Sequence, residues 1–473
     1  MALTSEQEES FRDTVSHIDK QGNRVWFYPK KPAGRYYNAR TLITYLYLIV
    51  FFGLPFVKVN GNPFFLMNVL ERKFILFGVR FWPQDFFIFV LGMLIFILFI
   101  ALFTVVFGRV FCGWVCPQTV FMEMVFRKIE YAIEGDFTHQ KALNKAPWTA
   151  TKIRKKGLKW TIFFIISVLV ANTFLAYIIG VDELKKIITE PLSQHIGGFV
   201  MMIVFSAVFF FIYLWFREQV CLVVCPYGRM QGVLLDQHSI VVAYDHVRGE
   251  PREKYSKSPS PGTGDCIDCF ECVRVCPTGI DIRHGTQLEC VNCTACIDAC
   301  DHIMEKTDRP KGLIRYASEF NIVRKRKLRI TPRMIAYTGI LLALVTLESF
   351  LLVTRSDLDV TMIRARGMLF NREPDGRINN LYSVKILNKT HSDMTIEFRP
   401  QMEGAEAKPI IQPLTVKADS LLESEMFIIL GVNSIRHQKE ELKIDVWSSG
   451  KKIQTIRANF LGPAVKSSNI ETP

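Results

Sequence analysis

Eight cysteines in one short stretch carry the clearest chemistry in this sequence. The spacing C-x2-C-x2-C-x3-C occurs twice, from Cys266 to Cys276 and from Cys290 to Cys300. Three thiolates on a short loop bind three corners of a 4Fe-4S cubane, and the fourth cysteine of each run reaches the other cluster. The spacing therefore predicts two 4Fe-4S clusters as cofactors. The two predicted ligand sets are Cys266, Cys269, Cys272 with Cys300, and Cys290, Cys293, Cys296 with Cys276.

Zinc is the competing interpretation, because paired C-x2-C motifs also build structural zinc sites. Zinc takes four ligands per ion and does not need eight cysteines in a doubled triplet spacing. The spacing therefore favours iron, and two clusters in one small module indicate one-electron transfer between neighbouring centres. Asp301 stands where a proline often follows the second run, which changes a turn and not a ligand.

The remaining four cysteines form two pairs at the ends of apolar segments. Both pairs have the arrangement C-x3-C-P, in FGRVFCGWVCPQTVF and in FREQVCLVVCPYGRM. If a helix runs through each pair, residues i and i+4 share a face, so Cys112 stacks on Cys116 and Cys221 on Cys225. Proline cannot continue a helix without losing a hydrogen bond, so a kink or a new helix is expected directly after the thiols.

The two pairs lie in repeated contexts. A two-helix hairpin, an arginine shortly before the first cysteine (Arg109 or Arg217), the C-x3-C-P turn and an amphipathic stretch follow one another twice. Duplicated hairpins would bring the four thiols together near the membrane surface. Thiolates, with Met122, Met124 and Met230 nearby, suit Cu(I), an iron-sulfur centre or zinc, and spacing alone does not choose among them. The simpler alternative is that these cysteines are small buried hydrophobic residues.

The elements that must position these cysteines are membrane helices. Five apolar runs have about 20 residues, the length that crosses a bilayer. They begin near Thr41, Asp85, Trp160, Ile196 and Met334, and they predict five transmembrane helices. A sixth run at 63–83 contains charges that are costly inside a bilayer, so it is expected to be a loop on the outer surface. The first helix begins too late for a cleaved signal peptide and is expected to stay as an anchor.

Lysine and arginine indicate the orientation. They are concentrated before the first helix, between the second and third, and in VRKRKLRITPR before the fifth. The positive-inside rule places these segments in the cytoplasm, so the net charge of +13 is mostly a topology signal and does not indicate nucleic-acid binding. All 12 cysteines lie between Cys112 and Cys300, on the predicted cytoplasmic side, where disulfides are rare and thiols more often serve as ligands.

The segment after the fifth helix predicts a β-domain on the outside. NLYSVKIL, MTIEF, ELKIDVW and KIQTIRANF alternate apolar and polar residues between turn-forming stretches. About seven such runs in roughly 100 residues fit an immunoglobulin-like sandwich, whose expected role is protein contact. Glu348 lies near the outer end of the fifth run, where pairing with Arg355 is expected. No G-x-G-x-x-G fingerprint follows a strand, so the electron donor is expected to be a separate molecule.

Several motifs in combination resemble a known family. They are FWPQDFF, GRVFCGWVCPQTVFMEMVF, the doubled cysteine stretch from GDCIDCF to DHIMEK, and PKGLIRYAS. From about Tyr28 to Phe460 the chain resembles the cytochrome c oxidase accessory proteins called CcoG, FixG or RdxA. The resemblance implies a bacterial inner-membrane protein with two 4Fe-4S clusters that reduces Cu(II) to Cu(I) for assembly of the cbb-type oxidase. Carried over by position, the copper-handling catalytic thiols are Cys112, Cys116, Cys221 and Cys225.

The predicted fold is an α-helical polytopic membrane protein of about five transmembrane helices, with an inserted cytoplasmic ferredoxin-like module for two 4Fe-4S clusters and a C-terminal all-β immunoglobulin-like sandwich. The predicted domains are a cytoplasmic N-terminal segment (1–40), a four-helix membrane domain with both C-x3-C-P motifs (41–235), the cluster module (236–333), the fifth transmembrane helix (334–354) and a periplasmic sandwich (355–473).

The expected partners follow from this chemistry. Electrons would come from a soluble cytoplasmic donor, and Cu(I) would leave to a copper exporter, insertion factors or oxidase subunits, with a homodimer as a further arrangement. Two alternatives stay open. One is a quinol-linked membrane ferredoxin, although relatives of that class end soon after the clusters. The other is a non-enzymatic copper chaperone or assembly scaffold whose clusters are structural.

Overall fold

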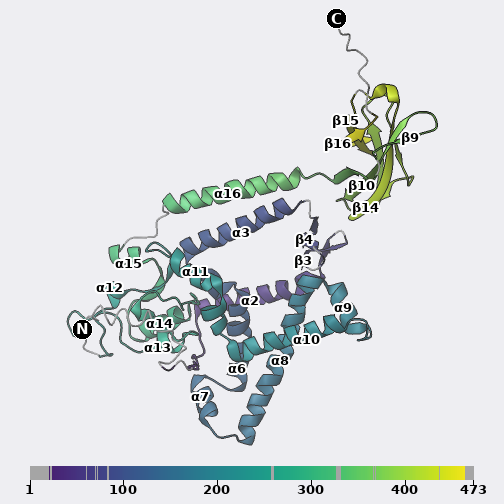
Figure 1. Cartoon of the computed structure of the whole chain (residues 1–473). Helices are drawn as coiled ribbons and strands as arrows, with labels where there is room; N and C mark the ends of the chain where they lie inside the picture. The colour runs from purple at the N-terminus through teal and green to yellow at the C-terminus, as the bar shows by residue number, and fades with distance from the viewer. Residues whose placement is uncertain are drawn as a thin grey trace. The chain divides into compact units, whose positions relative to one another are not determined.

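The computed structural model describes two compact units, Met1–Glu348 and Ser349–Pro473, which are presented separately (Figure 1). The described residues are 21, 24–59, 61–69, 71, 73–82, 85–256, 260–325, 332–365, 367, 369–435 and 437–463. The whole first half of the predicted N-terminal segment, residues 1–20, and the middle of the basic run before the fifth helix, residues 326–331, lie outside these ranges.

Five helices in the described ranges are long and apolar enough to cross a membrane, which confirms the predicted number. They are Arg35–Phe56 (α2, Arg35–Gly53, with η1, Leu54–Phe56), α3 (Phe86–Phe107), α8 (Ala150–Ile179), Ile196–Phe216 (α10, Ile196–Phe211, with η4, Ile212–Phe216) and Met334–Val353 within α16 (Pro332–Val353). Only 6% of the most apolar stretch of α3 and 0% of that of α16 is buried by protein. Such exposure of apolar side chains suits contact with lipid.

Helix α8 begins about ten residues before the apolar run that predicted it. Its first turns carry lysines and an arginine, and two of these lysines, Lys156 and Lys159, form ion pairs with acidic residues of a neighbouring helix. Because those partners neutralise the charges, the helix extends beyond its apolar part.

The segment at 63–83, expected as a loop, contains a three-stranded antiparallel sheet of β3 (Phe65–Asn68), β4 (Lys73–Leu76) and β5 (Val79–Phe81). The preceding strands β1 (Lys58–Val59) and β2 (Asn62–Pro63) form a separate small hairpin. Glu71 lies at a turn and Lys73 and Arg80 lie in strands, while Ile75 is buried. That the segment 63–83 lies on the outer surface of the membrane stays a prediction.

Short helices carry or follow the two cysteine pairs and connect the long helices. They are α4 (Val110–Trp114), α5 (Pro117–Thr119), η3 (Val120–Phe126), α6 (Arg127–Ile133), α7 (Phe137–Lys145), α9 (Val181–Thr189), η5 (Val220–Val224) and α11 (Pro226–Leu234). Phe121 and Phe126 of η3 pack against Phe163 of α8 and Tyr213 of η4 in a buried aromatic core. This core fixes the chain directly after the first cysteine pair.

The cysteine module follows α11. Strands β6 (Val241–Tyr244) and β7 (Ile314–Ala317) pair in antiparallel fashion and frame the segment that carries eight cysteines. Between them lie α12 (His246–Gly249), α13 (Glu271–Arg274), η6 (Ile282–His284) and α14 (Ala295–Lys306), and α15 (Glu319–Arg324) follows. Helices α13 and α14 pack against each other (Figure 1), which brings the two cysteine runs together.

The C-terminal unit consists of two antiparallel sheets. One has the order β12-β14-β10-β8 with β9 paired to β10, and the other has the order β13-β11-β15-β16. The strands are β8 (Leu358–Arg364), β9 (Asn371–Arg372), β10 (Ile378–Asn388), β11 (Met394–Pro400), β12 (Glu406–Pro409), β13 (Thr415–Val416), β14 (Ser420–Leu430), β15 (Lys439–Ser448) and β16 (Lys451–Leu461). All four alternating runs of the sequence lie in strands, and their apolar residues form one shared core.

Candidate metal centres

The first predicted cluster set lines one cavity of the cysteine module. Its thiols come from Cys266 and Cys269 on a loop, Cys272 on α13 and Cys300 on α14. Two residues of the loop, Asp268 and Phe270, have positive φ angles of 53° and 59°. Left-handed residues at these alternate positions curl the backbone around the cavity. Mostly apolar side chains complete the wall.

The second set lines a neighbouring cavity with the same local geometry. Its thiols belong to Cys276, Cys290, Cys293 and Cys296. Asn292 and Thr294, at the positions equivalent to the left-handed residues of the first loop, have φ angles of 52° and 66°. Cys272 borders this cavity as well as the first. The two sites are therefore direct neighbours, which suits electron transfer between them.

The donor sets fit 4Fe-4S clusters. Within the described ranges, no three His, Cys, Asp or Glu side chains lie close enough to hold a single ion. A cubane binds its four thiolates at separate iron corners, whereas tetrahedral zinc needs them around one point. Burial raises the pKa of the Cys290 and Cys300 thiols to about 12 and that of Cys293 to about 11. Because such thiols do not ionise readily alone, metal binding would supply the charge that displaces their protons.

Arg283 holds the loop of Cys266 and Cys269. It was not singled out from the sequence. Its buried guanidinium forms ion pairs with Asp268 and with Asp281 at 2.5 Å, and it lies 4.1 Å from the ring centre of Phe270. Burial by itself would raise the pKa of Asp281, but the Arg283 contacts lower it. The positively charged side chain thus fixes two residues of the cysteine loop.

The C-x3-C-P motifs share one backbone geometry that differs from the expected continuous helix. The N–H groups of Cys116 and Cys225 donate to carbonyls five residues earlier, at 2.9 and 2.8 Å, and both cysteines have extended ψ angles of 125° and 110°. The following proline disfavours a helical conformation at these positions. Helices α4 and η5 therefore end before the second thiol, and new helices begin at Pro117 and Pro226, as expected; the two cysteines of a pair do not lie on one continuous helix.

The two C-x3-C-P motifs also align differently in the structure than the sequence suggested, where Arg109 was matched with Arg217. The residue four positions before the first cysteine has a positive φ in both motifs: 56° at Gly108 and 52° at Arg217. Gly108, rather than Arg109, is thus the structural counterpart of Arg217. Glycine adopts this conformation freely, whereas arginine is strained there and needs other contacts to hold it.

The four membrane-edge thiols gather in one region. Burial, followed by the proximity of Cys116, Cys112 and Cys225, raises the pKa of the Cys221 thiol to about 12. Cys116 is also close enough to Cys225 for the two to influence each other. The absence of a three-ligand group among the described residues means that these thiols are near one another without surrounding a single point.

A buried hydroxyl lies among these thiols. Thr119 Oγ1 is near the thiols of Cys116 and Cys221 and has no well-formed hydrogen bond in the described part of the chain. Met122 lines the cavity that contains Cys221, whereas Met230 is exposed. An unsatisfied buried oxygen is unusual and marks a place where a ligand or a proton would be accommodated.

The cysteine module contacts the membrane-edge thiols directly. Cys112 packs against a cluster of buried residues that includes Val291, Cys293 and Ala295, with Cys296 beside it. A methyl group on Gly113 would lie only 2.5 Å from the carbonyl oxygen of Val291. The small residue inside C-G-W-V-C thus lets the second cysteine loop approach the first pair.

Cys221, in the second C-x3-C-P motif, also lies next to loops of the cysteine module. It lines a cavity with Glu123 and Glu218 and with Pro277, Thr278 and Val291 of the cysteine module. Both pairs of membrane-edge cysteines therefore adjoin the backbone that carries the second cluster set.

Two buried arginines connect the helices to this loop. Arg40 of α2 donates to the carbonyl of Cys293 at 3.2 Å. Arg109 donates to the carbonyls of Leu288, Cys290 and Gly228. Positive charge next to ligand thiols favours their ionised, metal-bound form. Sequence reasoning treated Arg109 only as part of a repeat.

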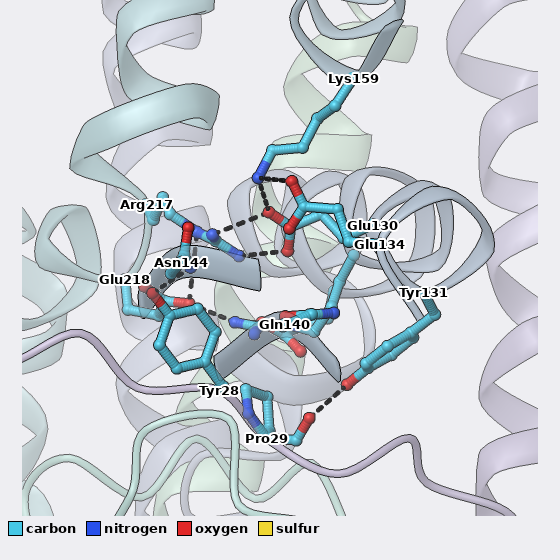
Figure 2. A network of polar contacts seen from close by, with 12 residues as sticks. Tyr28, Pro29, Glu130, Tyr131, Glu134, Gln140, Asn144, Lys159, Arg217 and Glu218 are labelled. Atoms are coloured by element: carbon cyan, nitrogen blue, oxygen red, sulfur yellow. Dashed lines mark hydrogen bonds and ion pairs between the residues drawn. The ribbon is translucent and has the colours of Figure 1, made fainter. Parts of the chain in front are cut away.

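A buried charge network lies behind the second motif (Figure 2). Arg217 forms a two-point pair with Glu130, at 3.0 and 2.8 Å, and Lys159 contacts Glu130 at 2.9 Å and Glu134 at 3.2 Å. Burial would raise the pKa of Glu130, but Arg217 and Lys159 lower it. These contacts hold Arg217 in its strained conformation.

Known families match three parts of the chain. Residues 216–319 match a 4Fe-4S dicluster domain, residues 89–134 match a 4Fe-4S binding domain, and residues 349–463 match the IG-like fold at the C-terminus of FixG. Among curated proteins, RdxA of Cereibacter sphaeroides is 34% identical over 93% of this chain and 98% of its own length. FixG of Rhizobium meliloti is 33% identical over 80% of this chain and 79% of its own length.

RdxB of Cereibacter sphaeroides is 32% identical over 89% of this chain and 92% of its own length. These similarities extend over the helices, the cysteine module and the β-unit. With five apolar helices, domains for 4Fe-4S binding and an IG-like C-terminal unit, the chain belongs to the FixG/RdxA family of membrane-associated iron-sulfur electron-transfer proteins.

Proposed function

We propose that this protein reduces Cu(II) to Cu(I) at the bacterial inner membrane and supplies the monovalent ion for assembly of the cbb-type cytochrome c oxidase. The observation that carries the proposal is the direct packing of Cys112 against the loop of Cys293 and Cys296. Soft thiols, which prefer Cu(I), thus adjoin a site built for one-electron chemistry.

The roles of the residues follow from their positions. The two sets of four cysteines hold the clusters, which when bound supply one-electron transfer. The C-x3-C-P thiols take up Cu(II), which gains one electron and leaves as Cu(I). Two thiolates satisfy Cu(I), so copper can be bound by one pair, within a motif or across the motifs. Thr119 is positioned to accept or donate a hydrogen bond as the thiols lose their protons.

The proposal also includes the orientation. Basic residues flank the predicted cytoplasmic ends of the helices, so the N-terminal segment and the cysteine module are assigned to the cytoplasm and the β-unit to the periplasm. The proposal keeps the five domains predicted from the sequence, with boundaries at 1–40, 41–235, 236–333, 334–354 and 355–473. A soluble donor would then reach the cysteine module, while the β-unit would contact the partners of oxidase assembly.

A second candidate is an iron-sulfur centre at the four membrane-edge thiols. It is favoured by the match of residues 89–134 to a 4Fe-4S binding domain, because Cys112 and Cys116 are the cysteines in that range. Such a protein would pass electrons onward, as in the quinol-linked alternative. Two clusters require about eight iron atoms per chain and a third 4Fe-4S cluster about twelve.

Replacing Cys112, Cys116, Cys221 and Cys225 together with alanine tests the proposal. We expect anaerobically purified protein to keep about eight iron atoms per chain and to lose Cu(II) reduction driven by dithionite, followed with a Cu(I)-specific chelator. The matched control is Cys293→Ala, which should lose iron and activity together.

Full cupric reduction by the quadruple variant would refute the role of these thiols. A loss of about four iron atoms in the quadruple variant, from about twelve in the natural protein, would favour the third cluster instead. Cluster absorbance that does not respond to dithionite would favour a scaffold with structural clusters.

A further inference from the structure

A broad groove of about 1060 Å³ opens on the cysteine module. Residues 30–36, which precede and begin α2, form one side, and α14 with the start of β7 forms the other. The groove is separate from both cysteine cavities and from the cavity at Cys221.

The floor of the groove contacts both cluster sets. Ile314 lines the groove and also the first cysteine cavity, where its backbone lies near the thiol of Cys300. Val275 lines the groove and packs with Cys293 of the second set. One layer of side chains therefore separates anything bound in the groove from the ligands of the clusters.

The acidic side chains of the groove are engaged by the protein. Asp298 accepts from the backbone N–H groups of Tyr36 and Tyr37, at 3.1 and 2.8 Å. Glu271 is paired with Lys30 at 2.8 Å and with Arg274 at 2.9 Å. Asp301 accepts from the N–H of Gly312, and Glu305 pairs with Lys311. Glu271 and Glu305 are thus balanced by basic partners, whereas Asp298 and Asp301 are held by neutral backbone N–H groups and keep their charge.

Several basic side chains of the groove remain available. Lys31, Arg35 and Lys306 are exposed and have no acidic partner among the residues that the structure describes. Arg315 pairs with Asp245 at 2.7 Å but keeps 41% of its side chain exposed. The groove thus presents a positively charged rim over an apolar floor, a combination that attracts a negatively charged protein and admits it to close contact.

We propose that this groove is the docking site of an acidic one-electron carrier protein that reduces the clusters. The inference deepens the proposed function, on which it rests, by naming the chemistry of the electron donor. The carrier gives one electron to the cysteine module, no bond forms or breaks, and the carrier leaves in its one-electron oxidised form. A one-electron carrier matches a 4Fe-4S site, which accepts electrons singly.

The experiment uses the full-length chain with its clusters in lipid nanodiscs and an acidic flavodoxin in its hydroquinone form as the probe. The variant is Lys31→Glu with Arg35→Glu and Lys306→Glu. We expect the second-order rate of cluster reduction, followed by stopped-flow absorbance, to fall at least about tenfold at low ionic strength. The rate for the natural protein should fall as salt is added, while the rate of reduction by dithionite should be the same in both proteins.

The matched control reverses three exposed basic residues outside the groove: Lys141→Glu, Arg154→Glu and Lys254→Glu. It carries the same change in net charge, so it should keep a rate within about twofold of the natural protein. Iron content and the visible spectrum show that both variants are folded.

Equal losses in the groove variant and the control would overturn the docking site, as would an unchanged rate in the groove variant. Direct reduction by NADH that depends on the same three residues would also overturn it, in favour of a small hydride donor. Natural protein that accepts electrons from flavodoxin through the groove but does not reduce copper would defeat the proposed function and leave the docking site standing.

Discussion

Gly113 matters because no larger side chain fits between it and the second cysteine loop. Its position beneath the carbonyl of Val291 lets the second cysteine loop lie against the first C-x3-C-P pair. Other functional contacts also depend on single residues, since Arg40 and Arg109 each donate to backbone carbonyls of that loop. At this scale, the arrangement of thiols depends on non-cysteine neighbours.

We predict that Gly113→Ala pushes the loop away, because backbone atoms at 2.5 and 2.8 Å from the new methyl group cannot move independently. The change should lower the free energy of unfolding by about 1–3 kcal/mol and reduce copper turnover, with iron content retained. Thermal unfolding and the chelator assay measure both effects.

Gly157→Ala is the matched control, since a methyl group there meets open space within α8. It should be neutral or stabilise the helix by up to about 1 kcal/mol. Similar copper turnover in Gly113→Ala and the natural protein would contradict the proposed path between the second cluster set and Cys112.

Helix ends and the contacts behind them set the geometry of the thiol pairs. Both second thiols lie where a helix stops before proline, and both motifs begin with a positive φ. At Arg217 the conformation is held by the pairing with Glu130 on α6, a different helix (Figure 2). The charge network therefore fixes the backbone four residues before Cys221.

We predict that Glu130→Gln lowers the free energy of unfolding at neutral pH by about 3–5 kcal/mol, because it leaves buried cations without their partner. The pKa of Glu130 is lowered from its ordinary value of 4.5, so its stabilisation is present above pH 4.5 and is lost as the pH falls toward the lower folded value. The stability of the natural protein should therefore decline on acidification below about pH 4.5, and the variant should decline less over the same range. Thermal unfolding followed by circular dichroism measures this.

Glu183→Gln provides the control, because Glu183 pairs with Lys186 on the exposed surface of α9. Such a pair contributes about 0–1 kcal/mol. A pH profile of Glu130→Gln that parallels the natural one would exclude Glu130 as the source of the acid dependence.

The whole molecule divides its chemistry between two units. All 12 cysteines belong to the first unit, and the second has an apolar core of its own between two sheets. The cysteine module instead builds much of its interior from cysteine side chains. Metal binding should therefore contribute to the folding of one unit and not of the other.

We predict that removing iron with a chelator under reducing conditions makes residues 260–325 sensitive to protease, while residues 369–435 and 437–463 remain resistant. Mass spectrometry of the fragments, compared with the iron-loaded protein, measures this. If the β-unit were cleaved as readily as the cysteine module, the two units would not fold independently.

Several features could be predicted because they depend on short stretches of sequence. Cysteine spacing reflects the size of a cluster, helix length reflects the thickness of a bilayer, and alternating residues reflect the two faces of a strand. The five apolar helices and the four β-runs are confirmed on this basis. The three-stranded sheet within 63–83 was missed, because its runs are short and interrupted by charge.

The sequence by itself determined the kinds of chemistry available to this protein: soft sulfur ligands in two spacings, apolar helices and a separate β-unit. Only the tertiary structure decided that Cys112 lies against the second cluster loop, that Arg217 is held by Glu130, and that a basic groove adjoins both cluster sets. Those relations join residues far apart in the chain. Their contact depends on how whole elements pack, and no local spacing encodes it.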